Sequence, residues 1–327
     1  MTGIDGSVEI AHELDRLSQS SVVAEHAPRS KALYAYLARG MQEGGDVSGA
    51  PSHEFMDITN RLIEKLGIWW SPQGYSQLPV IVPWCVRDRS CRYDQGPESW
   101  GAPRDDGYLR DDNSIIKKLP LTCVVSAPLD HPYRDRKPWR GFTACHIWRD
   151  MPDRTLAGAD PWLYSFMPNL IWLPSWLSPL TDRQSSEVQR TLQRTSMALF
   201  REAQVPSQLQ SYAEYGWSKL HEPPPGYVLP VERLAMFDPH EKFFRNRINY
   251  LDKMVAGTQA VLTCGSLPAK LICSRYTVGL PQLDSAAIFE FGTAMKDYRD
   301  AVVNASSARH RHDLPGVAKR EPRAVKP

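Results

Sequence analysis

Two short apolar stretches each carry one polar residue that could take part in catalysis. The first, TACHIWRD, holds His146, and the second, MPNLIWLP, holds Asn169. A histidine with an ordinary pKa of about 6.5 can accept a proton from water at neutral pH. An asparagine offers a carbonyl oxygen that can bind a metal ion or orient a neighbouring group. The alternatives are structural: a satisfied buried histidine, and a turn residue after Pro168.

Hydrophobic patterning predicts the elements that position these two residues. The expected strands are residues 77–86, 119–127, 140–148 and 170–174. The expected helical regions are residues 8–42, 54–67, 180–205 and 238–262. Ser52 is a plausible N-cap and Gly67 a plausible end for the second of these regions. Thr181 and Gln184 have the spacing of a capping box at the start of the third.

The composition is that of a soluble protein with a substantial core. The chain has 327 residues, of which 42% are hydrophobic and 23% charged, together with 27 prolines and ten tryptophans. This length allows one large domain or two ordinary ones, and the many prolines favour a loop-rich fold. We expect four regions: a helical part (1–75), a central part with a long loop (76–205), a mainly helical part (206–305) and a disordered tail (306–327). The tail carries the basic excess of the chain, with Arg309, Arg311, Lys319, Arg320, Arg323 and Lys326 against Asp313 and Glu321.

Several classes of protein are excluded or disfavoured by the sequence. The best candidate for a membrane span, residues 163–180, contains three prolines that would break a helix in a bilayer. The N-terminus has no apolar stretch of the kind found in a signal peptide, so we expect a cytoplasmic protein. Its cysteines should then be thiols or metal ligands, and the loose pair Cys85 and Cys91 leaves a structural Zn²⁺ site open. Phosphate-binding loops, dinucleotide fingerprints, the serine nucleophile elbow and the HExxH motif are missing.

The order of the remaining features resembles one enzyme family. A strand ending at His146, a loop, Asn169, the strand LIWLP and a helix follow one another between residues 143 and 195. This order resembles the HNH, or ββα-metal, nucleases, and in particular their type II restriction endonuclease branch. The upstream stretch RDDNSIIKKLP also looks like sequence from such enzymes. The resemblance implies an α+β fold in which a ββα-metal core is embedded between helical flanking regions.

The resemblance also implies roles for individual residues. His146 would activate the water that attacks a phosphodiester, and Asn169 would bind or orient a single Mg²⁺ or Mn²⁺ ion. The family usually has Asp or His before the base, where this chain has Cys145, a soft ligand that suits Mg²⁺ poorly. Asp182 could supply the missing carboxylate, or could be only a favourable charge at a helix start. Asp150 is another possible carboxylate ligand.

The implied partner is double-stranded DNA. Arginine can pair with guanine or with phosphates, and a cluster of such residues fits a DNA-facing surface. The residues expected to contact DNA are Arg110, Asp112, Asn113, Arg149, Arg183, Arg245 and Arg247. A palindromic target would imply a homodimer. The sequence therefore predicts a sequence-specific DNA endonuclease, with two alternatives: a repair or phage-defence nuclease that acts on structured or modified DNA, and a non-catalytic DNA-binding protein with a decayed site.

Overall fold

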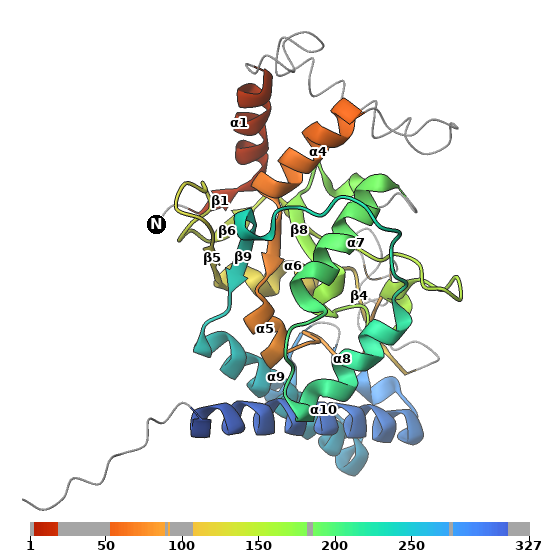
Figure 1. Cartoon of the computed structure of the whole chain (residues 1–327). Helices are drawn as coiled ribbons and strands as arrows, with labels where there is room; N and C mark the ends of the chain where they lie inside the picture. Colours follow the sequence, from red (N-terminus) through yellow and green to blue (C-terminus); the bar gives the residue numbers. More distant parts are fainter. Residues whose placement is uncertain are drawn as a thin grey trace, which may run out of the picture.

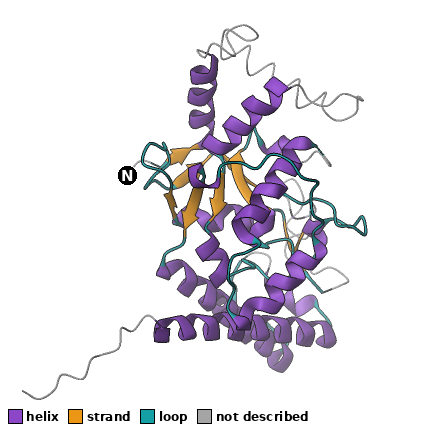
Figure 2. Cartoon of the chain, in the orientation of Figure 1, coloured by secondary structure: helices purple, strands orange, loops and turns teal. Residues whose placement is uncertain are grey.

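The computed structural model describes residues 3–18, 53–88, 91, 107–181, 186–274 and 277–312. These residues form an α+β fold in which eight α-helices surround a mixed sheet (Figure 1). The predicted fold class is confirmed at this level. In the view of Figure 2 the helices lie above, below and to the right of the strands, and loops lie on the left side of the strands.

The central sheet has five strands in the order β5-β9-β2-β8-β7. Their bounds are β5 (Val124–Ser126), β9 (Ala235–Asp238), β2 (Ile68–Trp70), β8 (Leu170–Pro174) and β7 (Phe142–His146). The pair β2–β9 is parallel and the other three pairs are antiparallel. Strands β2, β8 and β9 come from three of the four regions drawn from the sequence, so one sheet joins these regions.

Two smaller parallel pairs flank this sheet. One joins β1 (Ile4–Asp5) to β6 (Pro138–Arg140), and the other joins β3 (Cys85–Arg87) to β4 (Leu109–Asp111). The second pair matters for the site because β4 ends at the buried carboxylate of Asp111.

The α-helices differ widely in length. They are α1 (Gly6–Ser18), α4 (His53–Leu66), α5 (Pro72–Gln77), α6 (Ser114–Lys118), α7 (Glu187–Phe200), α8 (Ser207–Lys219), α9 (Glu241–Cys264) and α10 (Ser285–His312). Short 3-10 turns lie at Leu119–Thr122, Ala157–Ala159, Met167–Asn169, Ser178–Leu180, Val231–Arg233, Ala269–Leu271 and Leu280–Gln282. Helices α9 and α10 pack against each other at the foot of Figure 1.

Buried aromatic rings hold the middle of the sheet together. Trp70 on β2 and Trp172 on β8 are fully buried, and their ring centroids lie 5.8 Å apart in an edge-to-face arrangement. Phe237 on β9 contacts both rings, at 5.4 and 5.1 Å. Such pairs add to the free energy gained by burying the rings themselves. The apolar run LIWLP is an interior strand that is buried along its whole length, so both faces of the sheet are covered at this strand.

The two strands predicted around the site are confirmed, as β7 and β8. The stretch 119–127 is a strand only in its last part, because a 3-10 turn precedes β5. The strand expected at 77–86 is found only at its last two residues, which belong to β3, and the rest of that prediction is wrong. Helix α5, capped by the Ser71 hydroxyl, occupies residues up to Gln77, and Val80 makes only an isolated bridge to Phe166. Pro79 and Pro83 cannot donate to a ladder, which explains the failure.

The ends of the helices differ from the sequence-based predictions more than the bodies of the helices do. Helix α4 ends just before Gly67 as predicted, whereas Ser52 lies outside the described residues. Of the region 8–42, the structure describes a helix only as far as Ser18. The helix start expected at Thr181 is wrong, and Gln184, the second residue of the predicted capping box, lies outside the described residues. Helix α7 begins at Glu187 instead, capped by the Ser186 hydroxyl, which accepts from the Gln189 amide at 3.2 Å.

The last helix extends beyond the region that was expected to be helical. Helix α10 continues to His312, and so includes the first residues of the expected tail. The remainder of the expected tail lies outside the described residues. In the part of the chain that the structure describes, no helix has both the length and the apolar character needed to cross a bilayer.

Gly216 on α8 gives a test of how tightly these layers pack. A Cβ at this position would lie 2.6 Å from the fully buried ring of Phe166, which is itself held between Tyr75 and Trp217. We expect Gly216→Ala to lower the free energy of unfolding by roughly 1–3 kcal/mol, despite the better helix propensity of alanine. Gly257→Ala on α9 is the matched control, because its nearest neighbour would be the end of the flexible Leu267 side chain, at 3.0 Å, and the next, Leu280, would be at an ordinary contact distance of 3.9 Å. Chemical denaturation of both variants measures the difference, and equal stabilities would contradict this packing.

Candidate functional site

His146 is the last residue of β7 and pairs with Leu170, the first residue of β8. Asn169 immediately precedes that pair, so the two predicted residues lie together at one end of an antiparallel strand pair. The next α-helix along the described chain is α7. The two strands and the helix therefore occur in the predicted order. The loop of residues 147–168 connects the end of β7 to the 3-10 turn that precedes β8.

Asn169 holds the two ends of this loop together. Its side-chain Oδ1 accepts a hydrogen bond from the Trp148 amide at 2.6 Å, and its Nδ2 donates to the Leu163 carbonyl at 3.4 Å. Its main-chain carbonyl accepts from the Ile147 amide at 2.9 Å. The side chain is fully buried. These contacts fit the orienting role, which is one of the two roles left open for Asn169, because both polar atoms of its side chain hold the loop.

His146 is held in one protonation state by its surroundings. Its Nε2 lies 2.9 Å from the Tyr164 carbonyl oxygen, which can only accept, so Nε2 carries the proton. The pKa of His146 is lowered from 6.5 to about 4, chiefly by burial and to a smaller extent by the nearby Arg87, while the hydrogen bond to the Tyr164 carbonyl opposes the shift. The ring is therefore neutral at pH 7, and Nδ1 carries the lone pair that can accept a proton.

Tyr164 connects His146 to a second polar group. The Tyr164 hydroxyl donates to Asp111 Oδ2 at 2.5 Å, and both residues are fully buried. The same carboxylate accepts from the amides of Asp112, Ser114 and Ile115 at the start of α6. Neither Asp111 nor Tyr164 was among the predicted site residues. The RDDN stretch gave a signal for Asp111, but nothing in the sequence singled out Tyr164.

Helix α7 is attached directly to the loop that carries the site. Gln189 donates from its side chain to the Ile147 carbonyl at 3.1 Å, and the Ser196 hydroxyl donates to the Pro168 carbonyl at 2.5 Å. Both acceptors are next to a predicted site residue. The helix therefore holds the loop on the side of Ile147 and on the side of Pro168.

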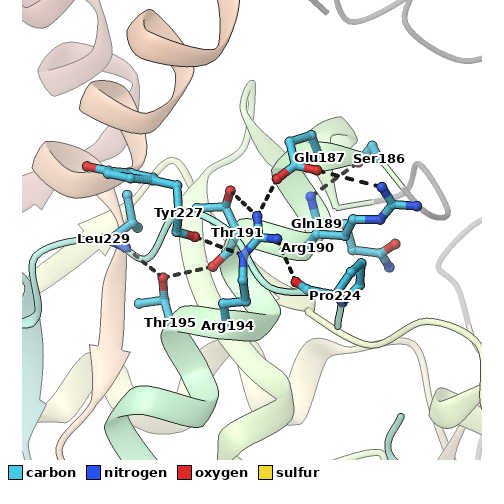
Figure 3. A network of polar contacts seen from close by, with 10 residues as sticks. All are labelled: Ser186, Glu187, Gln189, Arg190, Thr191, Arg194, Thr195, Pro224, Tyr227 and Leu229. Atoms are coloured by element: carbon cyan, nitrogen blue, oxygen red, sulfur yellow. Dashed lines mark hydrogen bonds and ion pairs between the residues drawn. The ribbon is translucent and has the colours of Figure 1, made fainter. Parts of the chain in front are cut away.

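A buried arginine ties a second segment to α7 (Figure 3). We name residues 221–229, which include the three consecutive prolines, the strap. Arg194 is only 7% exposed and donates to the Pro224 and Tyr227 carbonyls, at 2.9 Å each, as well as to the Glu187 carboxylate. The Thr195 hydroxyl accepts from the Leu229 amide at 3.1 Å. The other end of the strap accepts from the Trp148 indole, through the His221 carbonyl.

The predicted metal ligands do not form a metal site in the described residues. Cys145 lies next to His146 in β7, so its side chain points to the opposite face of the sheet, and its thiol donates weakly to the Thr143 carbonyl. Asp182 lies outside the described residues. Asp150 has a buried carboxylate oxygen for which no hydrogen-bond partner is found. Over the described ranges, no group of three or more histidine, cysteine or acidic side chains could hold a metal ion.

The same finding applies to the Zn²⁺ site considered for Cys85 and Cys91. Neither forms a disulfide, and both are fully buried. Burial raises the pKa of the Cys85 thiol well above its usual value, and the nearby Asp111 raises it further. A neutral buried thiol behaves as a small apolar side chain, which is the alternative that the sequence left open.

The RDDN stretch lies at the end of β4 and the start of α6. Arg110 is paired with Asp88 at 3.5 Å, and its side chain is only 14% exposed. The Asp112 carboxylate accepts from the Ser114 amide, and Asn113 has a left-handed backbone (φ 74°) immediately before α6. In the described structure these side chains shape a turn, and their expected contacts with DNA stay a prediction.

The other predicted DNA contacts are scattered. Arg149 is half-buried, and its carbonyl accepts from the Ala157 amide at 2.8 Å. On α9, Arg245 is exposed, whereas Arg247 is buried with its guanidinium 4.5 Å from the Tyr250 ring centroid. Burial lowers the pKa of Arg247. The structure therefore does not place Arg245 and Arg247 on one phosphate-binding face, and Arg183 lies outside the described residues.

The comparisons with known proteins add no further assignment. The chain matches no protein-family model, no curated protein and no solved structure. The function is therefore inferred from the geometry around His146 and from the order of the residues.

The buried state of His146 predicts how stability depends on pH. The unfolded chain binds a proton at this residue near pH 6.5, whereas the folded chain does so only near pH 4. Between these values the unfolded state holds more protons, so stability is lost as the pH falls. The loss should be on the order of 3 kcal/mol by pH 4. His146→Gln should show a shallower fall than the wild type in denaturation curves from pH 7 to pH 4, and identical slopes would contradict the assigned burial.

Proposed function

We propose that this protein is a metal-dependent endodeoxyribonuclease that cleaves double-stranded DNA at a specific sequence, in the manner of a type II restriction enzyme. The observation that supports this most strongly is the state of His146. It is a neutral histidine at the end of a strand, with Nε2 engaged by the Tyr164 carbonyl and the lone pair of the ring on Nδ1. The loop beside it is fixed by Asn169, and the strand pair is followed by α7, as in the resemblance drawn from the sequence.

The proposed step uses His146 as a general base. Nδ1 accepts a proton from a water molecule as the water oxygen attacks the phosphorus atom. The phosphorus–oxygen bond to the leaving sugar breaks, and that oxygen takes up a proton from solvent. A pKa of about 4 would make a weak base in the free protein. The negative charge of a DNA phosphate beside the ring would raise this pKa, because it stabilises the imidazolium form.

The metal requirement is a separate proposal. Mg²⁺ or Mn²⁺ prefers several oxygen ligands, and the described residues do not offer such a set near His146. Asn169 Oδ1 is engaged by the Trp148 amide, and Cys145 is on the other face of its strand. These residues do not fit the ion as the sequence predicted, so no step of the proposed reaction is assigned to it. Asp182 remains the predicted carboxylate.

A second candidate is a DNA-binding protein without catalytic activity. The engaged amide of Asn169 and the placement of Cys145 favour this alternative, because both positions belong to the metal site of the family that the sequence resembles. Such a protein would bind DNA but cleave neither plain nor modified DNA with any divalent ion.

A homodimer is proposed for the restriction-type enzyme, and analytical ultracentrifugation with and without a DNA duplex tests it.

Plasmid cleavage with Mg²⁺ or Mn²⁺ tests the proposal directly. We expect discrete fragments from the wild type, no fragments after chelation of the metal by EDTA, and a rate lower by about 10²- to 10⁴-fold for His146→Ala. His131→Ala is the matched control, because His131 is also buried and burial lowers its pKa to about 4 as well.

The outcomes separate the candidates. Smeared products, or cleavage only of modified DNA, would favour the repair or phage-defence alternative. Equal rates for the wild type and His146→Ala would remove His146 as the base. Normal DNA affinity without cleavage would favour the non-catalytic candidate.

A further inference from the structure

Tyr164 contacts His146 in two ways. Its carbonyl oxygen accepts the hydrogen bond from Nε2 at 2.9 Å, and its ring centroid lies 5.6 Å from that of the imidazole. The position of this one residue therefore decides which nitrogen of His146 carries the proton. A displacement of the Tyr164 carbonyl would release Nε2 and allow the proton to move to Nδ1, which would remove the base.

The hydroxyl of Tyr164 is fixed by a rigid group. The bond to Asp111 Oδ2, at 2.5 Å, is in the range of charge-assisted O–H···O⁻ hydrogen bonds, which are stronger than neutral ones. Asp111 is itself held by the amides of Ser114 and Ile115 at the first turn of α6. The position of the carboxylate is therefore set by the β4–α6 turn.

The remainder of the segment around Tyr164 is held in the same way. The Tyr164 amide donates to the Asp160 carbonyl at 3.0 Å. The Asp160 carboxylate accepts from the Trp162 and Leu163 amides and from the Tyr215 hydroxyl. Asn169 fixes the Leu163 carbonyl, one residue before Tyr164. Of these contacts, only the bond to Asp111 reaches the Tyr164 side chain beside the imidazole ring.

We infer that Asp111 and Tyr164 are positioning residues that keep the proton of His146 on Nε2 and present Nδ1 to the substrate. This inference rests on the proposed role of His146 as the base. It gives the RDDN stretch a function that differs from the expected contact with DNA. It also distinguishes this role of Asp111 from a purely structural role in capping α6. Capping requires the hydrogen bonds from the amides, but not the hydrogen bond from the Tyr164 hydroxyl.

The test compares Tyr164→Phe and Asp111→Asn with Tyr133→Phe. Tyr133 is the matched control, because it is fully buried and no partner is found for its hydroxyl. The protein is labelled with ¹⁵N-histidine, and the nitrogen shifts of His146 report its tautomer at pH 7 without DNA. Single-turnover cleavage and DNA affinity are measured on the same samples. Near-ultraviolet circular dichroism checks that each variant is folded.

We expect Tyr164→Phe and Asp111→Asn to mix the two tautomers of His146 and to slow cleavage by about 100-fold, with DNA affinity unchanged, since a small misplacement of a catalytic group has this effect. Tyr133→Phe should change neither the tautomer of His146 nor the rate of cleavage.

If Tyr164→Phe keeps the wild-type tautomer and the wild-type rate, the inference is overturned while the proposed nuclease stands. If the wild type cleaves nothing but the tautomers still mix in the variants, the positioning role stands and the proposed nuclease is overturned. Tyr164→Phe removes one oxygen atom and leaves the α6 cap intact, so it remains informative if Asp111→Asn fails to fold.

Discussion

The hydrogen bonds made by Asn169 are the interaction on which the site depends. They join the residues after β7 to the residues before β8, and so close the loop that contains Tyr164. All of these groups are buried, where an unsatisfied amide or carbonyl costs about 1–3 kcal/mol. The amide side chain of asparagine has both an acceptor and donors, and this loop uses both. An aspartate could replace only the acceptor, and a leucine neither.

This closure explains how His146 can be both buried and oriented. Burial alone would leave a neutral imidazole free to adopt either tautomer. The Tyr164 carbonyl removes that freedom. It can only accept a hydrogen bond, and it lies beside Nε2, so Nε2 must carry the proton. Helix α7 and the strap add rigidity from outside the loop, through Gln189 at one side and through Arg194 behind it. Gly226 in the strap is required by this arrangement, since a Cβ there would lie 2.4 Å from the Arg194 guanidinium.

The sequence predicted the elements with strong patterns. The strands β7 and β8, helix α4 and the body of α7 follow from apolar periodicity, and the placement of His146 and Asn169 at the same end of the β7–β8 pair followed from the order of these elements. Strands β2 and β9 were missed because three or four residues are too few to show a period, and their pairing is fixed by tertiary contacts. The start of α7 was misplaced because two stretches, at Thr181 and at Ser186, offer hydroxyl caps, and only packing selects between them.

The site was predicted only in part, for a physical reason. Histidine and asparagine are noticed because their side chains do chemistry. Tyr164 contacts His146 through its main-chain carbonyl. Because other residues also have this group, the sequence does not single out the one that contacts the histidine. Asp111 was visible in the RDDN stretch, but its neighbours Arg110, Asp112 and Asn113 drew the prediction toward DNA contacts. The burial of Arg247 could not be deduced either, since Arg245 and Arg247 differ only in which side of α9 they occupy.

The central claim is that folding fixes His146 as a neutral imidazole with its proton on Nε2. The most direct measurement is a pH titration of the wild-type protein labelled with ¹⁵N-histidine, followed by nuclear magnetic resonance. The structure predicts that His146 shows one neutral tautomer at pH 7, protonated at Nε2, and takes up a second proton only near pH 4. A proton found on Nδ1 at pH 7, or a titration near the ordinary value of 6.5, would contradict the account.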